Sequence, residues 1–237
     1  MIASVDVVIP ALDEAESIGM VLASLPRPAI RRAVVCDNGS RDRTAEIARD
    51  HGAVVVCESR RGYGAACQCA LRALEDDPPE IVLFMDADRS DDPADLGSIL
   101  APILAGRADL VIGSRVLGTR ERGALTPQAR VGNWIATRLI AWLYGVRYTD
   151  LGPFRAIRYS SLASLGMGDP DFGWTVEMQV KAARRGLRSE EVPVRYRRRI
   201  GRSKISGTLS GATAAGVKIL GTIARDMALH GRPARSR

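Results

Sequence analysis

The sequence has few residues that could form disulfides or bind a transition metal. Its 237 residues include four cysteines and two histidines, and no two cysteines form a C-x-x-C pair. The histidines, His51 and His230, stand in no ligand spacing. We therefore expect neither a zinc site nor a disulfide framework, and we expect a reducing compartment.

Long apolar runs and internal repeats are also missing, and we expect no signal peptide. The first residues lack the basic region and the apolar core of a signal peptide. The two most apolar stretches, 131–146 and 209–229, are interrupted by Arg138 and by Lys218, Arg225 and Asp226. Since a span needs about 20 apolar residues, these stretches could lie on a membrane surface but are poor candidates to cross one. We expect a cytoplasmic protein, with peripheral contact at the inner face of the cell membrane left open.

Length and charge narrow the class further. A chain of 237 residues with 46% hydrophobic and 26% charged residues is typical of one soluble globular domain. This composition excludes a disordered tail, a collagen and a polytopic membrane protein. The 34 basic and 27 acidic side chains give a net charge of +7. That balance favours nucleotides, nucleic acid or an anionic membrane as partners, and charge alone does not choose among them.

The first half alternates strand-like and helix-like patterns. Runs rich in β-branched residues lie at 5–9, 33–36, 53–56, 81–85 and 108–112, and helical spacing occurs at 18–25, 44–50, 65–74 and 94–104. Strands that are apolar on both faces predict a buried parallel sheet. The alternation therefore predicts an α/β fold with right-handed crossovers and with ligands at the carboxyl ends of the strands.

The pattern changes after residue 116. We expect a Gly/Arg/Thr-rich loop at 118–123, helices near 128–144, 160–165, 175–185 and 209–229, strands at 154–157 and 191–196, and a basic loop at 197–204. The whole is expected to be one domain. Its parts are a nucleotide-binding half (1–115), an acceptor-side half (116–207), and a C-terminal helix with a basic tail (208–237).

The most informative motif is Asp86-Ala87-Asp88, which follows the strongest predicted strand. Two carboxylates two residues apart, just beyond a strand end, can face one cleft. Such oxygen ligands suit Mg²⁺ or Mn²⁺, which in turn clamps a diphosphate. The alternative is a solvated acidic turn.

Acids also follow the other two strands expected at this edge. Asp37 ends the second strand, and Asp13 and Glu14 follow the first. A glycine turn with a helix cap explains the residues around Asp37, and acids in a first helical turn are ordinary dipole partners. Neither account explains why three neighbouring strand ends all present acids, whereas a bound nucleotide with a metal does.

Together these motifs resemble the family 2 glycosyltransferases with a GT-A fold, and among them the dolichyl-phosphate and polyprenyl-phosphate mannose or glucose synthases. The resemblance covers roughly residues 5–207. It rests on residues 10–14, Asp37-Asn38-Gly39-Ser40-x-Asp42-x-Thr44, Gly62-x-Gly64-x-Ala66, Asp86-Ala87-Asp88, Gly113-Ser114-Arg115, Asp150-x-Gly152-x-Phe154-Arg155-Ala156, Glu177, Glu191-Val192-Pro193-Val194-x-Tyr196 and Gly201-x-Ser203-Lys204. The fold it implies is a Rossmann-like, parallel-centred mixed sheet flanked by helices.

The resemblance also implies roles for individual residues. The nucleoside pocket would be lined by Pro10, Ala11, Asp13 and Glu14, with Asp37 at the base, and Gly62 and Ala87 would contact the donor. Asp86 and Asp88 would hold Mg²⁺ or Mn²⁺, with Asp88 also catalytic. Arg115 and Arg130 would meet anionic groups, and Arg198 or Arg199, Ser203 and Lys204 would close over the phosphates.

Three departures from the family pattern bear on these roles. Ser90 stands where the family often has a Gln two residues after the second metal-site Asp, so the third metal contact is open. The motif before Arg155 is one residue longer than usual, and the stretch before Gly201 is one residue shorter than expected. The second difference leaves Arg198 and Arg199 indistinguishable by sequence.

The implied reaction is inverting transfer of a hexose from a GDP- or UDP-sugar. With a polyprenyl phosphate acceptor the attacking group is already an anion. A saccharide or small hydroxyl acceptor would need a general base, for which Glu177 is the candidate; alternatively, Glu177 pairs with Lys181 one helical turn away.

Two further features keep alternatives open. The arginine-rich segment 195–199 would suit a non-catalytic nucleotide- or nucleic-acid-binding protein, although no nucleic-acid module is visible and we expect no such partner. Trp134 and Trp142 belong to a broadly apolar helix, for which we expect packing on the sheet, with contact to a lipid acceptor as the alternative. The oligomeric state is not specified by the sequence.

Overall fold

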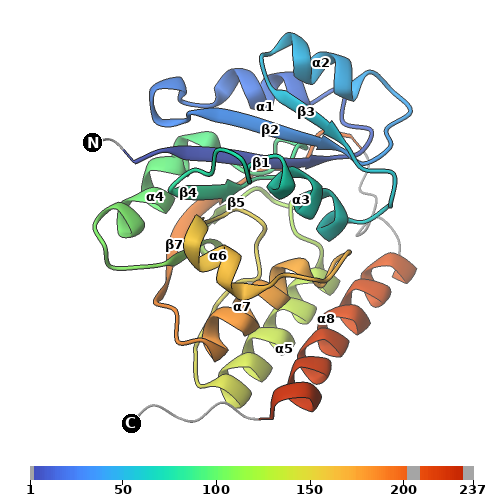
Figure 1. Cartoon of the computed structure of the whole chain (residues 1–237). Coiled ribbons are helices and arrows are strands. Elements are labelled where there is room, and N and C mark those ends of the chain that lie inside the picture. The colour runs from blue at the N-terminus through green and yellow to red at the C-terminus, as the bar shows by residue number, and fades with distance from the viewer. Residues whose placement is uncertain (1–2, 202–208, 232–237) are drawn as a thin grey trace.

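A computed structural model describes residues 3–201 and 209–231, with only the backbone path described for 209–215 (Figure 1). The strands are β1 (Val5–Ala11), β2 (Arg32–Asp37), β3 (Val54–Cys57), β4 (Ile81–Phe84), β5 (Leu110–Arg120), β6 (Arg155–Arg158) and β7 (Ser189–Tyr196). The α-helices are α1 (Ile18–Ser24), α2 (Thr44–Asp50), α3 (Tyr63–Arg72), α4 (Leu96–Leu104), α5 (Pro127–Tyr144), α6 (Tyr159–Leu165), α7 (Trp174–Arg184) and α8 (Leu209–His230). Short 3₁₀ turns occupy Arg27–Ala29 and Pro93–Asp95.

All seven strands form one mixed sheet in the order β3-β2-β1-β4-β6-β5-β7. Neighbouring strands are parallel except for β6, which is antiparallel to both β4 and β5. Ala11 is aligned with Asp37 and Val8 with Phe84, so β1, β2 and β4 end at the same edge. The predicted α/β fold with a parallel-centred mixed sheet is confirmed.

Helices cover both faces of the sheet because its strands are apolar on both faces. Val8 and Val34 pack against α3, α5, α6, α7 and α8, whereas Val7 and Val35 pack against α1, α2 and α4. Successive side chains of a strand point to opposite faces, so each uninterrupted valine run supplies two cores. None of the helices in the described part of the chain is both long enough and apolar enough to cross a membrane.

Two strand predictions need correction. The run at 53–56 is not buried on both faces, because β3 is the edge strand and Val54 is exposed. Residues 118–120 are not loop but the end of β5, which pairs with β7 through a register shift between Ser114 and Thr119. Local composition signalled a loop here, while long-range pairing with β7 determines a strand.

Gly118 permits that pairing. A Cβ at this position would lie 2.0 Å from the carbonyl oxygen and 2.5 Å from the amide nitrogen of Val194. Both atoms belong to the backbone of β7, which cannot move aside without disturbing the sheet. The close approach of the two strands therefore requires glycine.

We predict that Gly118→Ala lowers the free energy of unfolding by about 1–3 kcal/mol, the usual cost of overpacking. The matched control is Gly97→Ala in α4, where nothing lies within 4 Å of the added Cβ, and which should gain about 0.5–1 kcal/mol. Urea unfolding of both variants and the parent checks this. Equal midpoints for Gly118→Ala and the parent would contradict the close approach.

Candidate active site

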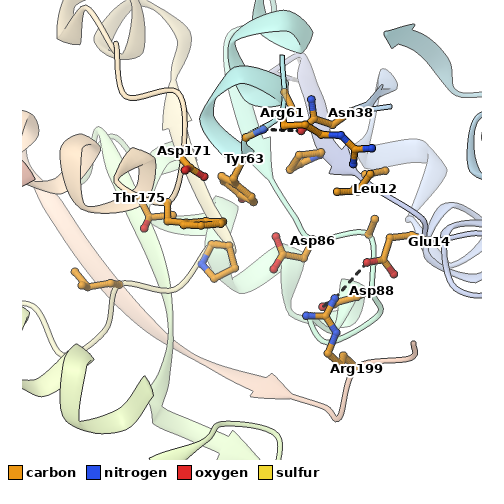
Figure 2. A pocket seen from close by; sticks show the side chains of 18 of the residues that line it. Leu12, Glu14, Asn38, Arg61, Tyr63, Asp86, Asp88, Asp171, Thr175 and Arg199 are labelled. Atoms are coloured by element: carbon orange, nitrogen blue, oxygen red, sulfur yellow. Dashed lines mark hydrogen bonds and ion pairs between the residues drawn. The ribbon is translucent and has the colours of Figure 1, made fainter. Parts of the chain in front are cut away.

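A cavity of about 510 Å³ opens at the carboxyl ends of β1, β2 and β4. One end is polar and is lined by Glu14, Asn38, Arg61, Asp86, Asp88 and Arg199 (Figure 2). Arg115 also lines the cavity, next to the loop that carries Leu151. The other end is largely apolar and is lined by Tyr63, Ala66, Leu151, Pro153, Phe172, Thr175 and Ile219, together with Asp171. Figure 2 shows Glu14, Asp88 and Arg199 together on one side of Asp86, and Tyr63, Asp171 and Thr175 on the other.

The carboxylates that follow β4 are held in a tight turn. Arg89 takes the left-handed conformation with a φ of 65°, and the amide of Ser90 donates to Asp88 Oδ1 at 2.9 Å. The amide of Asp86 donates to Asp91 Oδ2 at 3.1 Å. This turn places Asp86 and Asp88 at the cavity surface, with Asp91 buried directly behind them.

Crowding of these carboxylates has an electrostatic cost. Burial, reinforced by the charges of Asp88 and Asp91, holds the pKa of Asp86 well above its usual range. Burial raises the pKa of Asp91 to about 7, although the Asp86 amide opposes the shift. The turn therefore favours a nearby positive charge.

Two arginines from other parts of the chain supply positive charge. Arg199 Nη2 lies 3.2 Å from both Glu14 Oε1 and Asp88 Oδ2, so it bridges the loops after β1 and β4 (Figure 2). Arg115 donates from Nε and Nη2 to the two oxygens of Asp150, both at 2.7 Å. Burial works against the charge of Arg115, but the carboxylate of Asp150 keeps its pKa above the usual value.

The donor set fits a hard divalent cation. Asp86 and Asp88 present carboxylate oxygens to the cavity, and Asp91 Oδ1 is buried without a hydrogen-bond partner among the described residues. Oxygen ligands of this kind suit Mg²⁺ or Mn²⁺. Within the described part of the chain, no three His, Cys, Asp or Glu side chains form a complete metal cluster. A cation here would therefore take its remaining ligands from a bound diphosphate or from water.

Only some of the residues expected in the loops after β1 and β2 line the cavity. Pro10, Ala11 and Glu14 line it, but Asp13 and Asp37 do not. Asp37 Oδ1 accepts a hydrogen bond from the amide of Ser40 at 3.0 Å, and Asp13 Oδ1 accepts one from the amide of Arg41 at 2.7 Å. Both carboxylates therefore stabilise the turn beside the cavity.

Asn38 lines the cavity, although the sequence motif assigned it no role of its own. Its Nδ2 donates to the carbonyls of Glu58 and Arg60, at 3.0 and 2.8 Å, and its Oδ1 accepts from the amide of Gly62 at 2.8 Å. One side chain thereby ties the end of β2 to the loop before α3. The sequence signal that could have identified Asn38 as a cavity residue is its position directly after Asp37, at the end of a predicted strand.

The Gly62-x-Gly64 motif has a packing role as well as a place at the cavity. A Cβ at Gly62 would lie 2.2 Å from the carbonyl oxygen of Pro170, and one at Gly64 would lie 2.0 Å from that of Asp169. The amide of Ala65 donates to the Pro170 carbonyl at 2.7 Å. The α6–α7 loop therefore rests directly on the start of α3, and only glycine allows that contact.

Glu177 organises the same loop. Its carboxylate accepts hydrogen bonds from the amides of Gly168 and Asp169, at 3.1 and 2.8 Å, and lies 2.8 Å from Lys181 Nζ. It does not line the cavity, whereas Asp171 and Thr175 on either side of the α7 start do. This geometry favours the helix ion pair over the general base among the two interpretations of Glu177.

Arg155 connects two segments that line the apolar end of the cavity. Its side chain is buried and donates to the carbonyls of Leu151, Gly152 and Thr175, and to Gln179 Oε1. Burial lowers its pKa to about 10. A single guanidinium thus joins the loop that carries Leu151 and Pro153 to the helix that carries Thr175.

The predicted site residues divide into three groups. The structure brings Pro10, Ala11, Glu14, Gly62, Asp86, Ala87, Asp88, Arg115 and Arg199 together around the cavity. It does not place Asp13, Asp37, Glu177, Arg130 or Arg198 at the cavity wall; Arg130 lies exposed on α5, and Arg198 is exposed with its amide bound to Glu121. Ser203 and Lys204 lie outside the described residues. Of the two arginines that the sequence could not distinguish, Arg199 lines the cavity and Arg198 does not.

Among relatives compared by sequence, an uncharacterized glycosyltransferase of Mycobacterium tuberculosis is 40% identical over 215 residues, which cover 90% of this chain and 94% of that protein. A dolichyl-phosphate hexose transferase of Haloferax volcanii is 35% identical over 208 residues (87% and 88%). An undecaprenyl-phosphate mannosyltransferase of Micrococcus luteus is 30% identical over 247 residues (95% and 97%).

Solved structures agree on the fold. The crystal structure of glucosyl-3-phosphoglycerate synthase from Mycobacterium tuberculosis, in complex with Mn²⁺, UDP-glucose and phosphoglyceric acid, superposes with a TM-score of 0.75 at 25% identity, covering 98% of this chain and 81% of that one. The same enzyme was also crystallised with Mg²⁺ and UDP. The family model of Glycosyl transferase family 2 matches residues 6–166. The chain therefore belongs to glycosyl transferase family 2 and is a glycosyltransferase with a GT-A fold.

Proposed function

We propose that this enzyme transfers a hexose from a nucleoside-diphosphate sugar to a polyprenyl phosphate, with Mg²⁺ or Mn²⁺ as cofactor. The observation that carries the proposal is the two-ended cavity, with paired carboxylates and arginines at one end and an apolar wall at the other. A charged donor suits the first end and a lipid acceptor suits the second. Family membership sets aside the non-catalytic nucleotide- or nucleic-acid-binding alternative.

At the donor end, Asp86 and Asp88 would hold the cation, which when bound would neutralise diphosphate oxygens. Arg199 is already positioned beside Asp88, and Arg115 is fixed by Asp150. Charge that develops on the leaving diphosphate would thus meet cations whose orientation is set beforehand, which is usually the largest catalytic contribution.

The nucleoside would lie toward the ends of β1 and β2. Pro10, Ala11 and Asn38 line this part of the cavity. Asp37 is aligned with Ala11 in the sheet, which supports the proposal that its carboxylate contacts the base once a nucleotide is bound. In this arrangement residues 1–115 supply most of the donor site, with Arg199 added from the second half. Residues 116–207 with the helix in 208–237 supply most of the acceptor side, with Tyr63 added from the first half.

At the acceptor end, Tyr63, Leu151, Phe172 and Ile219 form an apolar wall. An acceptor phosphate is already an anion and needs no general base, which agrees with Glu177 being engaged by loop amides and Lys181. The names of the Haloferax and Micrococcus relatives support a lipid phosphate acceptor.

A second candidate keeps the donor and changes the acceptor. Asp171 is a partly buried carboxylate on the acceptor side of the cavity, and a carboxylate there could accept the proton of a hydroxyl acceptor. The Mycobacterium synthase, crystallised with phosphoglyceric acid, supports this alternative.

We predict metal-dependent release of nucleoside diphosphate that is stimulated by a short-chain prenyl phosphate and not by phosphoglycerate or free sugars. Asp88→Asn should lower turnover at least about 100-fold, because loss of one electrostatic contact to developing charge typically costs this much. Product formation with GDP- and UDP-hexoses, with and without EDTA, measures both. Stimulation by phosphoglycerate alone would favour the second candidate, and full activity in EDTA would contradict the role of the metal.

The two neighbouring arginines provide a matched pair. We predict that Arg199→Ala lowers kcat/KM about 10- to 100-fold, because it removes the cation that faces Asp88 and Glu14. Arg198→Ala, which alters an exposed side chain, should stay within twofold of the parent. Steady-state kinetics at saturating metal makes the comparison. An Arg198→Ala defect as large as that of Arg199→Ala would refute the assignment.

The variant Glu177→Gln distinguishes a role of Glu177 in holding the α6–α7 loop from a role in proton transfer. The amide oxygen of Gln can still accept a loop N–H, so we predict a loss of transfer below about tenfold. A general base would lose about 100- to 10,000-fold. Rates measured over a range of pH provide the readout, with thermal unfolding as the control for the lost Lys181 ion pair. A loss above 100-fold in a stably folded variant would restore Glu177 as the base.

A further inference from the structure

The exposed side of α5 is unusually apolar. Val131, Trp134, Ile135 and Trp142 are 58%, 59%, 41% and 62% exposed. Together with Arg138 they are spaced one, three or four residues apart along the sequence. On a helix with 3.6 residues per turn, this spacing puts all five side chains on one side. We call these five residues the α5 outer face. A contiguous patch of large apolar side chains on a protein surface marks a site of interaction.

The inner side of α5 is buried and partly polar. Asn133 donates from Nδ2 to the Thr149 carbonyl at 2.9 Å and accepts at Oδ1 from the Leu151 amide at 2.9 Å. Leu151 lines the apolar end of the cavity. The helix is therefore fixed by its inner side to the acceptor end, while two of the chain's three tryptophans face outward. This corrects the expectation that Trp134 and Trp142 pack on the sheet.

Every exposed charged side chain in the described parts of α5 and α8 is positive. α5 contains no acidic residue, and Arg130, Arg138 and the following Arg147 are exposed. In the neighbouring α8, the acid Asp226 is buried and accepts from Arg184 Nε at 3.0 Å, while Arg225 is exposed. The Arg138 guanidinium lies 5.6 Å from the centre of the Trp134 ring. The surface is thus both aromatic and cationic.

We infer that the α5 outer face docks onto an anionic lipid bilayer. Tryptophan rings prefer the level of the lipid headgroups, and arginines attract anionic headgroups. A helix lying in the interface with one aromatic, cationic side needs no membrane span. Positive charge with no exposed acid in the described parts of α5 and α8 complements an anionic surface and is not self-complementary, which argues against a second copy of this chain as the occupant.

Docking there would bring the bilayer close to the cavity. The inner side of α5 holds Leu151, and α8, which lies alongside α5 in Figure 1, contributes Ile219 to the cavity and exposes Val217 and Leu220. This inference rests on the proposed function, because the bilayer that holds a lipid phosphate acceptor would then lie beside α5 and α8, the helices next to the apolar end.

Vesicle binding tests the docking directly. We expect the protein to sediment with phosphatidylglycerol vesicles and not with pure phosphatidylcholine vesicles, and high salt should weaken the binding. Brominated lipids should quench Trp134 and Trp142, whereas Trp174, which is 1% exposed, should be spared. Failure of the parent protein to bind, or binding without quenching, would overturn the inference irrespective of any variant.

Variants localise the surface. Trp134→Ser with Trp142→Ser, and separately Arg138→Ser, should weaken vesicle binding at least tenfold. Arg49→Ser on α2, an exposed arginine at the opposite end of the molecule in Figure 1, should leave it unchanged. Equal binding by all variants would overturn the inference. Analytical ultracentrifugation is the companion measurement, because self-association that the tryptophan changes abolish, without vesicle binding, would assign the face to a second copy.

Activity distinguishes failure of the docking from failure of the proposed function. The double tryptophan variant should use a soluble short-chain prenyl phosphate as well as the parent does, but lose at least tenfold with a long-chain polyprenyl phosphate in vesicles. Equal rates on both acceptors would reject the docking and keep the transferase proposal. No turnover of either acceptor by the parent would reject the proposed acceptor.

Discussion

Three carboxylates, Asp86, Asp88 and Asp91, crowd into the seven residues that follow β4, and cations must face them for the charged turn to persist in the folded protein. Arg199 provides one such cation from the far end of the chain, and Arg115 lies across the same cavity, fixed by Asp150. Burial, together with repulsion from the neighbouring carboxylates, raises the pKa values of Asp86 and Asp91. A divalent cation with a diphosphate would satisfy the turn more fully than the arginines do, and this is the physical basis for proposing a nucleotide sugar as the donor.

A second constraint joins the two halves of the chain. The α6–α7 loop lies on Gly62 and Gly64 so closely that any side chain there would collide with its carbonyl oxygens. Glu177 holds the loop by its amides, while Lys218 of α8 lies 3.3 Å from Asp169 in the same loop. The donor end and the acceptor end are therefore parts of one packed unit. A substitution in α7 or α8 is therefore expected to shift the segment around Gly62 and Gly64 through these contacts.

Most of the fold could be predicted because each strand near the centre of the sheet is apolar on both faces and each helix has its own periodicity. The exceptions depend on partners distant in sequence: β7 makes a strand of 118–120, and the edge position leaves Val54 exposed. The site was predictable in its residue types, since acids at strand ends must meet at one edge. Orientation was not predictable. Asp37 bends back onto its own turn, and only tertiary structure distinguishes Arg199, at the cavity, from Arg198, in solvent. Apolar periodicity likewise could not tell the outer side of α5 from the inner one.

The central claim is that Asp86 and Asp88 share one divalent cation with the donor diphosphate. Electron paramagnetic resonance of Mn²⁺ tests it most directly, by measuring the affinity of the protein for the metal with and without nucleoside diphosphate. We predict that the protein binds Mn²⁺ alone weakly and binds it at least tenfold more tightly in a ternary complex with nucleoside diphosphate. Asp86→Asn and Asp88→Asn should each remove this enhancement. Metal affinity that is independent of the nucleotide, or an enhancement that survives both substitutions, would contradict it.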